Sequence, residues 1–365
     1  MTITALYVDT THNMDDSVVG RFARVLGLSP IRTENIAQVY EQIKRADDPC
    51  AAGKQALVLT ANHGPFLRKC PGTREYTCCD YHILNIGTYC TMDCAYCILQ
   101  SYFHPPLLHF FVNHEDLFAE LDQLIDSGQQ LRIGTGEFTD SLIWESYSDL
   151  THRLVTHFGR QERSVLELKT KTTAIAGLEG LPHKRKTIVA WSVNTPEVIA
   201  DQERGTATLK ARLRAAAQCQ AWGYPLAFHF DPIILYPGCE RAYAQVVDAI
   251  FGHVSAENIA WISMGTLRFM PLLHSVIQKR FPSSAIIYGE FIPGLDNKMR
   301  YFKPLRIKIY KHLMARIRRH APDLTTYLCM EDDAVWDQSF GFSPSLHGGL
   351  PVMLDTSAGR HCGLR

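Results

Sequence analysis

Three cysteines in one short segment, Cys90, Cys94 and Cys97, are the residues of this chain whose type and spacing most clearly predict chemistry. Thiolates are the usual ligands of iron–sulfur clusters, and a cluster of four irons takes four of them. Three cysteines leave one iron open, where the amino and carboxylate groups of a methionine derivative can bind. Its sulfonium would then lie beside the reduced cluster, and transfer of one electron would break a carbon–sulfur bond and release a radical.

Two other interpretations of these cysteines stay open. Structural zinc sites use four closed ligands, usually in pairs separated by two residues, and the three-residue gap after Cys90 fits that pattern poorly. A fourth ligand from Cys70, Cys78 or Cys79 would instead give zinc binding or a closed cluster that only transfers electrons.

The cysteine segment follows directly on a strand-like run, and strand-like and helix-like runs then alternate along the chain. The expected strands cover residues 80–87, 131–133, 165–168, 187–191, 225–230 and 259–263. The clearest helical runs cover residues 114–125, with Asn113 as N-cap, and residues 207–222. Six strands that alternate with helices predict an α/β fold, a partial (β/α)6-type barrel whose chemistry lies at the carboxyl ends of its strands.

Three parts are expected: an N-terminal α/β segment at residues 1–79, the partial barrel at 80–292 and a C-terminal extension at 293–365. The first part contains strand-like runs at residues 5–9 and 55–61. The extension ends in a strand at residues 325–329 and a glycine-rich tail after Pro344, which we expect to be loosely ordered.

A basic segment from Lys298 to His320 opens this extension. Its nine Lys or Arg residues, with no acid between them, are Lys298, Arg300, Lys303, Arg306, Lys308, Lys311, Arg316, Arg318 and Arg319. Its cations could meet the phosphates of DNA, and Tyr301, Phe302 and Tyr310 could stack on bases. A solvated helix that packs Ile309, Leu313 and Ile317 on the barrel explains the same residues.

The composition excludes several classes of protein. Lys plus Arg and Asp plus Glu are both 37, so no overall charge attracts a polyanion. We find no signal peptide and no run long enough to span a membrane, and the eleven cysteines are an odd number in a long chain. These features predict a cytoplasmic protein with reduced thiols.

The segment from Cys90 to Cys97 resembles the CxxxCxφC signature of radical S-adenosylmethionine enzymes, with Tyr96 as the aromatic residue. The surrounding sequence is similar to the spore photoproduct lyase family over roughly residues 65–330. The similar stretches are ILNIGTYCTMDCAYCILQ, FFVNHEDLF, WSVN, GYPLAFHFDPI and residues 259–281. The resemblance implies a [4Fe–4S] cluster, S-adenosylmethionine and a reducing partner such as flavodoxin or ferredoxin.

The resemblance also implies roles for single residues. The three cysteines would hold the cluster, Tyr96 would contact the cofactor, and Lys171 would pair with the cofactor's carboxylate. Ser192, in WSVN, matches a serine of the cofactor pocket, and its neighbour Asn194 is a further polar candidate.

The run GTGE at residues 134–137 resembles the GGE motif of radical enzymes. Gly136 would let the backbone approach the cofactor's methionine portion, and Glu137 could accept a hydrogen bond from its ammonium group. Asp140 could bind a ribose hydroxyl or cap the helix that follows.

Two positions of this chain depart from the pattern of the family's repair lyases. These repair lyases return a hydrogen atom from a cysteine after the second strand, where this chain has Phe138 or a near neighbour and no cysteine, and their tyrosine after the third cluster cysteine is Ile98 here. Cys239 and Cys329 are the candidate substitutes for the hydrogen donor.

The sequence therefore predicts a radical enzyme that cleaves S-adenosylmethionine and abstracts hydrogen from an unidentified substrate. One alternative is a true DNA photoproduct lyase that opens a methylene-bridged thymine dimer with a relocated hydrogen donor. Another is a DNA-associated iron–sulfur or zinc protein without catalysis.

Overall fold

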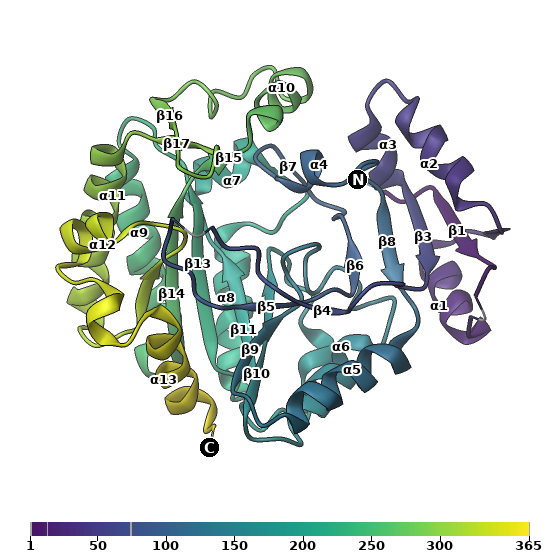
Figure 1. Ribbon diagram of the computed structural model, residues 1–365, viewed down its shortest axis with the longest axis horizontal. Coiled ribbons are helices and arrows are strands. Elements are labelled where there is room, and N and C mark those ends of the chain that lie inside the picture. Colours follow the sequence, from purple (N-terminus) through teal and green to yellow (C-terminus); the bar gives the residue numbers. More distant parts are fainter. Residues whose placement is uncertain (1, 13, 74, 365) are drawn as a thin grey trace.

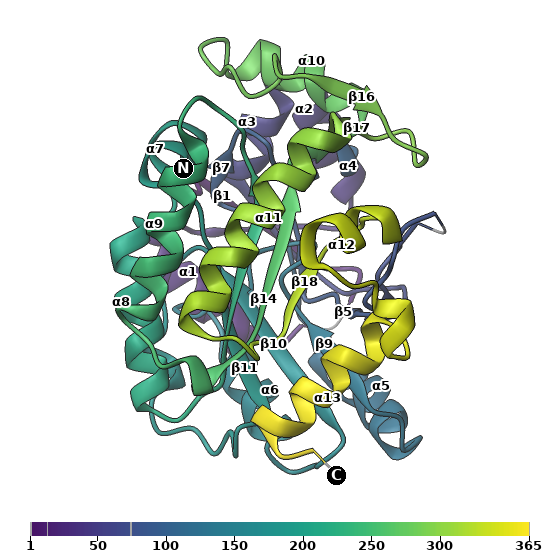
Figure 2. The same cartoon turned by 90° about the vertical axis from the view of Figure 1, so that its left-hand side faces the viewer.

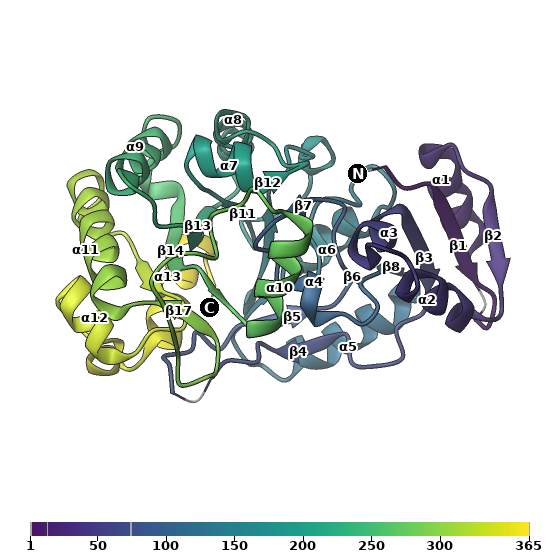
Figure 3. The same cartoon turned by 90° about the horizontal axis from the view of Figure 1, so that it is seen from above.

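The computed structural model describes residues 2–12, 14–73 and 75–364. Two sheets dominate it, with helices packed around them (Figure 1). Seen from above, the N-terminal sheet with β1 (Ala5–Asp9) lies at one end of the molecule, and α11 (Lys303–His320) lies at the other (Figure 3).

The larger sheet is the predicted partial barrel. Its eight strands, in spatial order, are β18 (Thr326–Leu328), β14 (Ile259–Thr266), β13 (Leu226–Ile233), β11 (Thr187–Ser192), β10 (Ser164–Thr170), β9 (Leu131–Gly134), β5 (His82–Leu84) and β4 (Leu67–Lys69). All neighbours pair in parallel except β4, which runs antiparallel to β5. The predicted α/β fold and curled barrel are thus confirmed.

Helices connect these strands as the sequence predicts. They are α5 (His114–Asp126), α6 (Leu150–Phe158), α7 (Pro196–Gln202), α8 (Leu209–Ala221), α9 (Cys239–Phe251) and α11, with short turns of 3-10 helix at Ala176–Leu178 and Ala256–Asn258. Asn113 takes the N-cap position of α5, but its side chain makes no capping bond there. It bonds instead to the backbone of Asn62 and to Asp116.

Strand β14 is buried along its whole length because helices cover the outer face of a parallel sheet while its inner face lines the barrel. Figure 2 shows α8, α9 and α11 on the outside of this sheet. The inner face is partly polar: His229 bonds to Glu167 at 2.8 Å and to Ser263 at 2.6 Å.

The smaller sheet has the order β2 (Pro30–Thr33), β1, β3 (Ala56–Thr60), β8 (Leu108–Phe111) and β6 (Gly87–Thr88). Its helices are α1 (Asp16–Leu26), α2 (Ile36–Lys44) and α3 (Pro49–Gln55). The strands predicted at residues 5–9 and 55–61 are present as β1 and β3. Because β6 and β8 come from beyond residue 79, the two sheets are interleaved in sequence, and the proposed division into three parts stays a prediction.

A small three-stranded sheet lies over one end of the barrel, together with α10 (Pro271–Arg280) (Figures 1 and 2). Its strands are β15 (Arg268–Phe269), β17 (Met299–Tyr301) and β16 (Phe291–Pro293). None of the described helices is long and apolar enough to cross a membrane.

The chain ends in α12 (Asp333–Phe340), a 3-10 turn at Pro344–His347 and α13 (Leu350–Cys362). The expectation of a loosely ordered tail after Pro344 is therefore wrong. Leu350, Leu354, Ala358 and Cys362 recur at a spacing of four, and all are buried. This apolar stripe outweighs the tail's glycines, because helical stability in proteins comes mainly from packing of such a face.

Candidate active site

The three cysteines lie on the loop that leaves β6, between the two sheets. The loop opens at Tyr89, which has the positive φ of 68° that non-glycine residues seldom adopt. Its middle forms β7 (Asp93–Cys94), which pairs with β12 (Glu203–Arg204), a two-residue strand from the segment after α7. The loop is thereby attached to the segment of the chain that follows β11 and α7.

Two buried side chains hold the backbone of this loop. Gln100, on α4 (Leu99–Tyr102), donates to the carbonyls of Cys94, Ala95 and Cys97 at 3.1, 3.0 and 3.3 Å. From α3 of the N-terminal segment, the Lys54 ammonium donates to the carbonyl of Cys90 at 2.8 Å. Sequence reasoning missed both residues, although Gln100 lies within the segment that resembles the family.

An arginine ties the loop to two further elements. Arg280, at the end of α10, makes a two-pronged contact with Asp93, at 3.0 and 3.3 Å, and another with Asp48, the N-cap of α3, at 2.8 and 3.0 Å. It also bonds to the side-chain oxygen of Gln100. The cysteine loop is thus held at a junction of α3, α4 and α10.

The three thiols fit an iron–sulfur cluster better than a zinc ion. Burial raises the pKa of Cys90 to about 12 and raises that of Cys94 further, so these thiols bind as thiolates only when a metal compensates for the charge. Among the described residues, no three His, Cys, Asp or Glu side chains gather closely enough to hold a single metal ion. A four-iron cluster is larger than one ion, and each of the three thiolates would bind a different iron of it.

Cys70, Cys78 and Cys79, the candidate fourth ligands, interact with one another and with Cys329. Cys78 hydrogen-bonds to Cys79, and the charges that act on Cys70 and Cys79 include that of Cys329, at the end of β18. Cys90, Cys94 and Cys97 are the three thiols of the loop itself.

A buried polar group lies against the loop at Tyr96. The Lys171 ammonium donates to the Tyr96 hydroxyl at 2.8 Å and lies 3.5 Å from Glu203, which also accepts from the Tyr96 hydroxyl. Arg212 closes the group with a bond of 2.5 Å to Glu203. Burial acts to lower the pKa of Lys171, but the charge of Glu203 outweighs it and raises that pKa. Lys171 is therefore a cation beside the cluster loop, as the resemblance implies.

Glu203 and Arg212 carried no signal in the sequence. Both side chains are almost fully buried, with exposures of 1% and 0%. Arg212, on α8, also donates to the carbonyl of Ser192 at 2.8 Å, which fixes the end of β11. Ser192 is half-buried at that strand end.

Asn194 is buried, and its side-chain amide is bonded within the protein. It donates to the carbonyl of Pro232 at 2.9 Å and accepts from the Tyr243 hydroxyl at 2.6 Å and from the backbone N–H of Thr195 at 3.1 Å. These bonds join the ends of β11 and β13.

The residues of GTGE follow β9. A side chain at Gly136 would meet Lys169 Cβ at 2.8 Å and Ser141 Oγ at 3.1 Å, so close packing on β10 accounts for this glycine. Glu137 forms an ion pair with Lys169. Asp140 accepts from the backbone N–H groups of Leu142 at 3.0 Å and Lys171 at 2.8 Å.

Asp140 thus connects the segment after β9 to the end of β10. Burial raises the pKa of its carboxyl, and its hydrogen bonds oppose that rise. The bond to the N–H of Leu142 is local. The bond to the N–H of Lys171 fixes the backbone of the residue whose ammonium group contacts Tyr96.

The two candidate hydrogen donors lie in different layers. Cys329 follows β18, and its sulfur accepts from Arg268 at 3.3 Å, while Arg268 forms an ion pair with Asp231 at 3.0 Å. Burial raises the pKa of Cys329 to about 11, and the charges that act on it include those of Asp231 and Glu137. Its thiol therefore stays protonated at neutral pH, at the strand ends that also carry GTGE.

Cys239, by contrast, begins α9. Its sulfur lies 3.7 Å from the Glu240 carboxylate, which is paired with Lys308 on α11. Cys239 is thus placed at the outer helix layer.

The basic segment is largely neutralised. Six of its nine cations form ion pairs: Lys298 and Arg300 with Asp296, Lys303 with Asp332, Arg306 with Glu331, Lys308 with Glu240, and Arg316 with Asp248. Tyr301 and Tyr310 are buried, so the expectation that they stack on bases is wrong, and only Phe302 is exposed. Ile309, Leu313 and Ile317 are buried, as the alternative of a helix packed on the barrel predicts.

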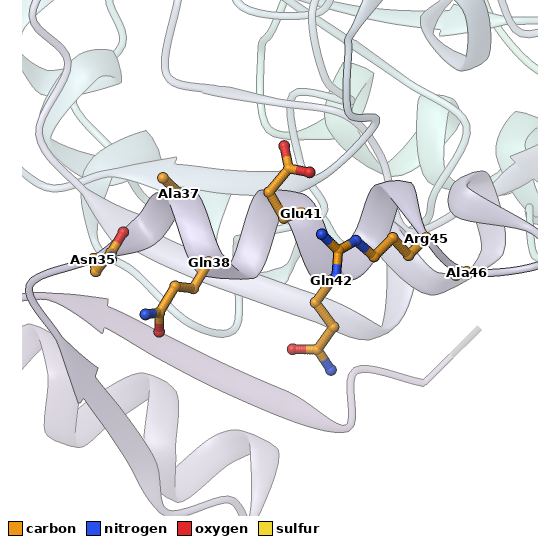
Figure 4. Close-up of a pocket in the computed structure, with 7 residues that line it drawn as sticks. All are labelled: Asn35, Ala37, Gln38, Glu41, Gln42, Arg45 and Ala46. Carbon is orange, nitrogen blue, oxygen red and sulfur yellow. The ribbon is translucent and has the colours of Figure 1, made fainter.

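A hollow on α2 lies away from these residues. Its lining comes from one helix and its ends: Asn35, Ala37, Gln38, Glu41, Gln42, Arg45 and Ala46 (Figure 4). No other element contributes to it, and it brings together none of the predicted site residues.

Comparison with known proteins decides the family. The model of the family described as "Spore photoproduct lyase" matches residues 73–316. This chain belongs to the spore photoproduct lyase family. Its members are radical S-adenosylmethionine enzymes, so the chain is an enzyme of the radical S-adenosylmethionine lyase type.

Individual members are distant relatives. The spore photoproduct lyase of Bacillus subtilis is 26% identical over 247 residues, which cover 66% of this chain and 70% of that protein. The lyase of Clostridium acetobutylicum is 24% identical over 254 residues, covering 69% and 71%.

Solved structures of the family share the fold. A cysteine-to-alanine mutant of spore photoproduct lyase superposes with a TM-score of 0.78 at 19% identity, covering 90% of this chain and 98% of that one. A double mutant with bound AdoMet and dinucleoside spore photoproduct gives a TM-score of 0.77, with the same identity and coverage.

Proposed function

We propose that this chain cleaves S-adenosylmethionine reductively and uses the resulting radical to open a methylene-bridged thymine dimer of the spore photoproduct type. The observation that carries the proposal is the loop with three buried or half-buried thiols and no fourth cysteine. The substrate class is supported by the family and by the related lyase whose structure contains dinucleoside spore photoproduct.

The chain's residues fit the cofactor pair. Cys90, Cys94 and Cys97 would hold a [4Fe–4S] cluster, which with S-adenosylmethionine supplies a 5′-deoxyadenosyl radical that abstracts hydrogen. Lys171 is a cation beside that loop and would pair with the carboxylate of the cofactor. Glu137 would accept from its ammonium group, in place of its present partner Lys169.

The donation of a hydrogen atom to the product radical must differ from that of the family's repair lyases, because the side chain of Phe138 has no thiol or other weakly bonded hydrogen to give. The thiol of Cys329 takes this role in our proposal. Its S–H bond breaks, and the hydrogen atom forms a C–H bond on the product. The sulfur is then short of one electron and one proton, which an external one-electron reductant and the solvent supply.

The cluster is tested first. After anaerobic reconstitution, we expect Mössbauer spectra in which one of four irons changes when S-adenosylmethionine is added, and reduction then yields 5′-deoxyadenosine. Four irons that all fail to respond, or bound zinc alone after anaerobic expression, would contradict the radical reaction and favour the non-catalytic alternative.

The hydrogen donor is tested in D2O, where the Cys329 thiol exchanges to S–D. We expect the reduced protein to convert dinucleoside spore photoproduct to thymines that carry one deuterium. Cys329→Ala should lose most of this label and accumulate trapped by-products, whereas Cys239→Ala, a matched control in the outer layer, should resemble the unmodified protein. Clean, labelled thymines from Cys329→Ala would show that another residue donates.

A further inference from the structure

Three aromatic side chains form a cluster at the edge of the cysteine loop. Tyr102 ends α4, the helix that begins two residues after Cys97, and Phe103 is its C-cap. Phe138 reaches them from the segment after β9. The rings of Tyr102 and Phe138 are stacked, with centroids 5.8 Å apart and planes 18° apart. Phe103 meets both edge-on, at 5.2 Å and 6.1 Å.

This aromatic cluster faces solvent. Tyr102 is 52% exposed, and Ile98, one helical turn earlier, is 40% exposed. Among the described residues, the Tyr102 hydroxyl has no hydrogen-bond partner. Folding alone gains little from a tyrosine ring held in this position, since the remaining half of its surface stays in water.

The cluster also lies between two parts of the proposed site. Tyr102 is five residues beyond the ligand Cys97, and Phe138 directly follows Glu137, which we assign to the cofactor's ammonium group. A flat ligand on the exposed surface of Tyr102 would therefore lie beside the place where the radical forms. Phe138 lies in the segment after β9, where the resemblance places the family's donor cysteine, so this segment carries an aromatic side chain in place of a reactive thiol.

We propose that Tyr102, backed by Phe138, is the surface on which one pyrimidine ring of the substrate stacks. The inference rests on the proposed function and extends it to a specific binding residue. Aromatic rings stack on any nucleobase through its flat face, and removing such a ring typically costs about 1–3 kcal/mol per base. Phe103 supports the stack from its edge.

The test is equilibrium binding of dinucleoside spore photoproduct to the reconstituted protein without reductant, so that no turnover occurs. We expect Tyr102→Ala to weaken binding about tenfold. Tyr102→Phe and Tyr102→Trp should restore most of the affinity, because they keep a flat ring. The matched control is Tyr288→Ala, which removes a 63% exposed tyrosine beyond α10 and should leave affinity unchanged.

Iron content and the unfolding midpoint of each variant show whether the protein is intact, and turnover is measured in parallel. Unchanged affinity in Tyr102→Ala, with clean turnover by the unmodified protein, would overturn the stacking surface while the proposed function stands. Binding that depends on Tyr102 without any turnover would support the surface and overturn the proposed function. No binding by the unmodified protein would overturn both.

Discussion

At the scale of single residues, Glu203 connects several side chains beside the cysteine loop. It pairs with Arg212 and Lys171 and accepts from the Tyr96 hydroxyl, so one carboxylate contacts two cations and orients an aromatic residue of the cluster loop. The pKa of Glu203 is lowered because the charges of Lys171 and Arg212 outweigh the opposing effect of burial. It is therefore ionised at neutral pH.

We expect Glu203→Ala to lower the free energy of unfolding by about 3–5 kcal/mol, because it leaves the fully buried Arg212 without its partner. Urea unfolding of the reconstituted protein measures this. The matched control is Asp16→Ala, which breaks the exposed pair with Arg32 and should cost no more than about 1 kcal/mol. Equal losses in the two variants would show that the buried group is not a stabilising unit.

At the scale of elements, the cysteine loop is held by its neighbours more than by its own residues. Its two-residue strand β7 pairs with β12, and Gln100 donates to three of its carbonyls. Preorganised ligands bind a cluster better than mobile ones, since less freedom is lost on binding.

We therefore expect Gln100→Leu to reduce iron incorporation severalfold during anaerobic reconstitution while leaving the far-ultraviolet circular dichroism unchanged. Iron and sulfide analysis, together with the cluster's visible absorbance, measures the effect. Gln38→Leu, on the exposed face of α2, is the control and should incorporate iron normally. Full incorporation in Gln100→Leu would mean that β12 and Lys54 hold the loop without it.

At the scale of the whole molecule, the barrel interior couples stability to pH. Glu167 on β10 bonds to His229 on β13, and His229 bonds to Ser263 on β14, so three strands share one buried network. Burial acts to raise the pKa of Glu167, but the charge and hydrogen bond of His229 outweigh it and lower that pKa to about 2.

A carboxyl whose pKa is lower in the folded than in the unfolded protein stabilises the fold above the unfolded pKa, near 4.5, and loses that effect as the pH falls toward 2. We expect the unfolding midpoint to drop steeply between about pH 4.5 and pH 3. Glu167→Gln should be less stable at pH 7 and show a shallower drop over that interval. A drop of the same steepness in this variant would assign the acid sensitivity to other carboxyls.

The sequence by itself determined the reaction class and the barrel. Cysteine spacing is a local property, as is the alternation of apolar strands with amphipathic helices, so residues 90–97 and the six strands could be recognised without coordinates. The position of Lys171 just past a strand also predicted that it faces the cysteine loop, because the carboxyl ends of parallel strands meet at one edge, and in the structure its ammonium donates to the Tyr96 hydroxyl.

The tertiary structure alone decided which polar side chains are bonded to other residues of the protein and which are available to a ligand. Glu203, Lys54 and Arg280 act through partners far away in the chain, and such contacts leave no periodic trace in the residues between. The same reason explains why the basic segment looked free of ion pairs: its acidic partners come from α9, from the N-cap of α12 and from neighbouring loops. Only the structure distinguishes the two candidate hydrogen donors, because it places Cys329 at a strand end of the barrel and Cys239 in the outer helix layer.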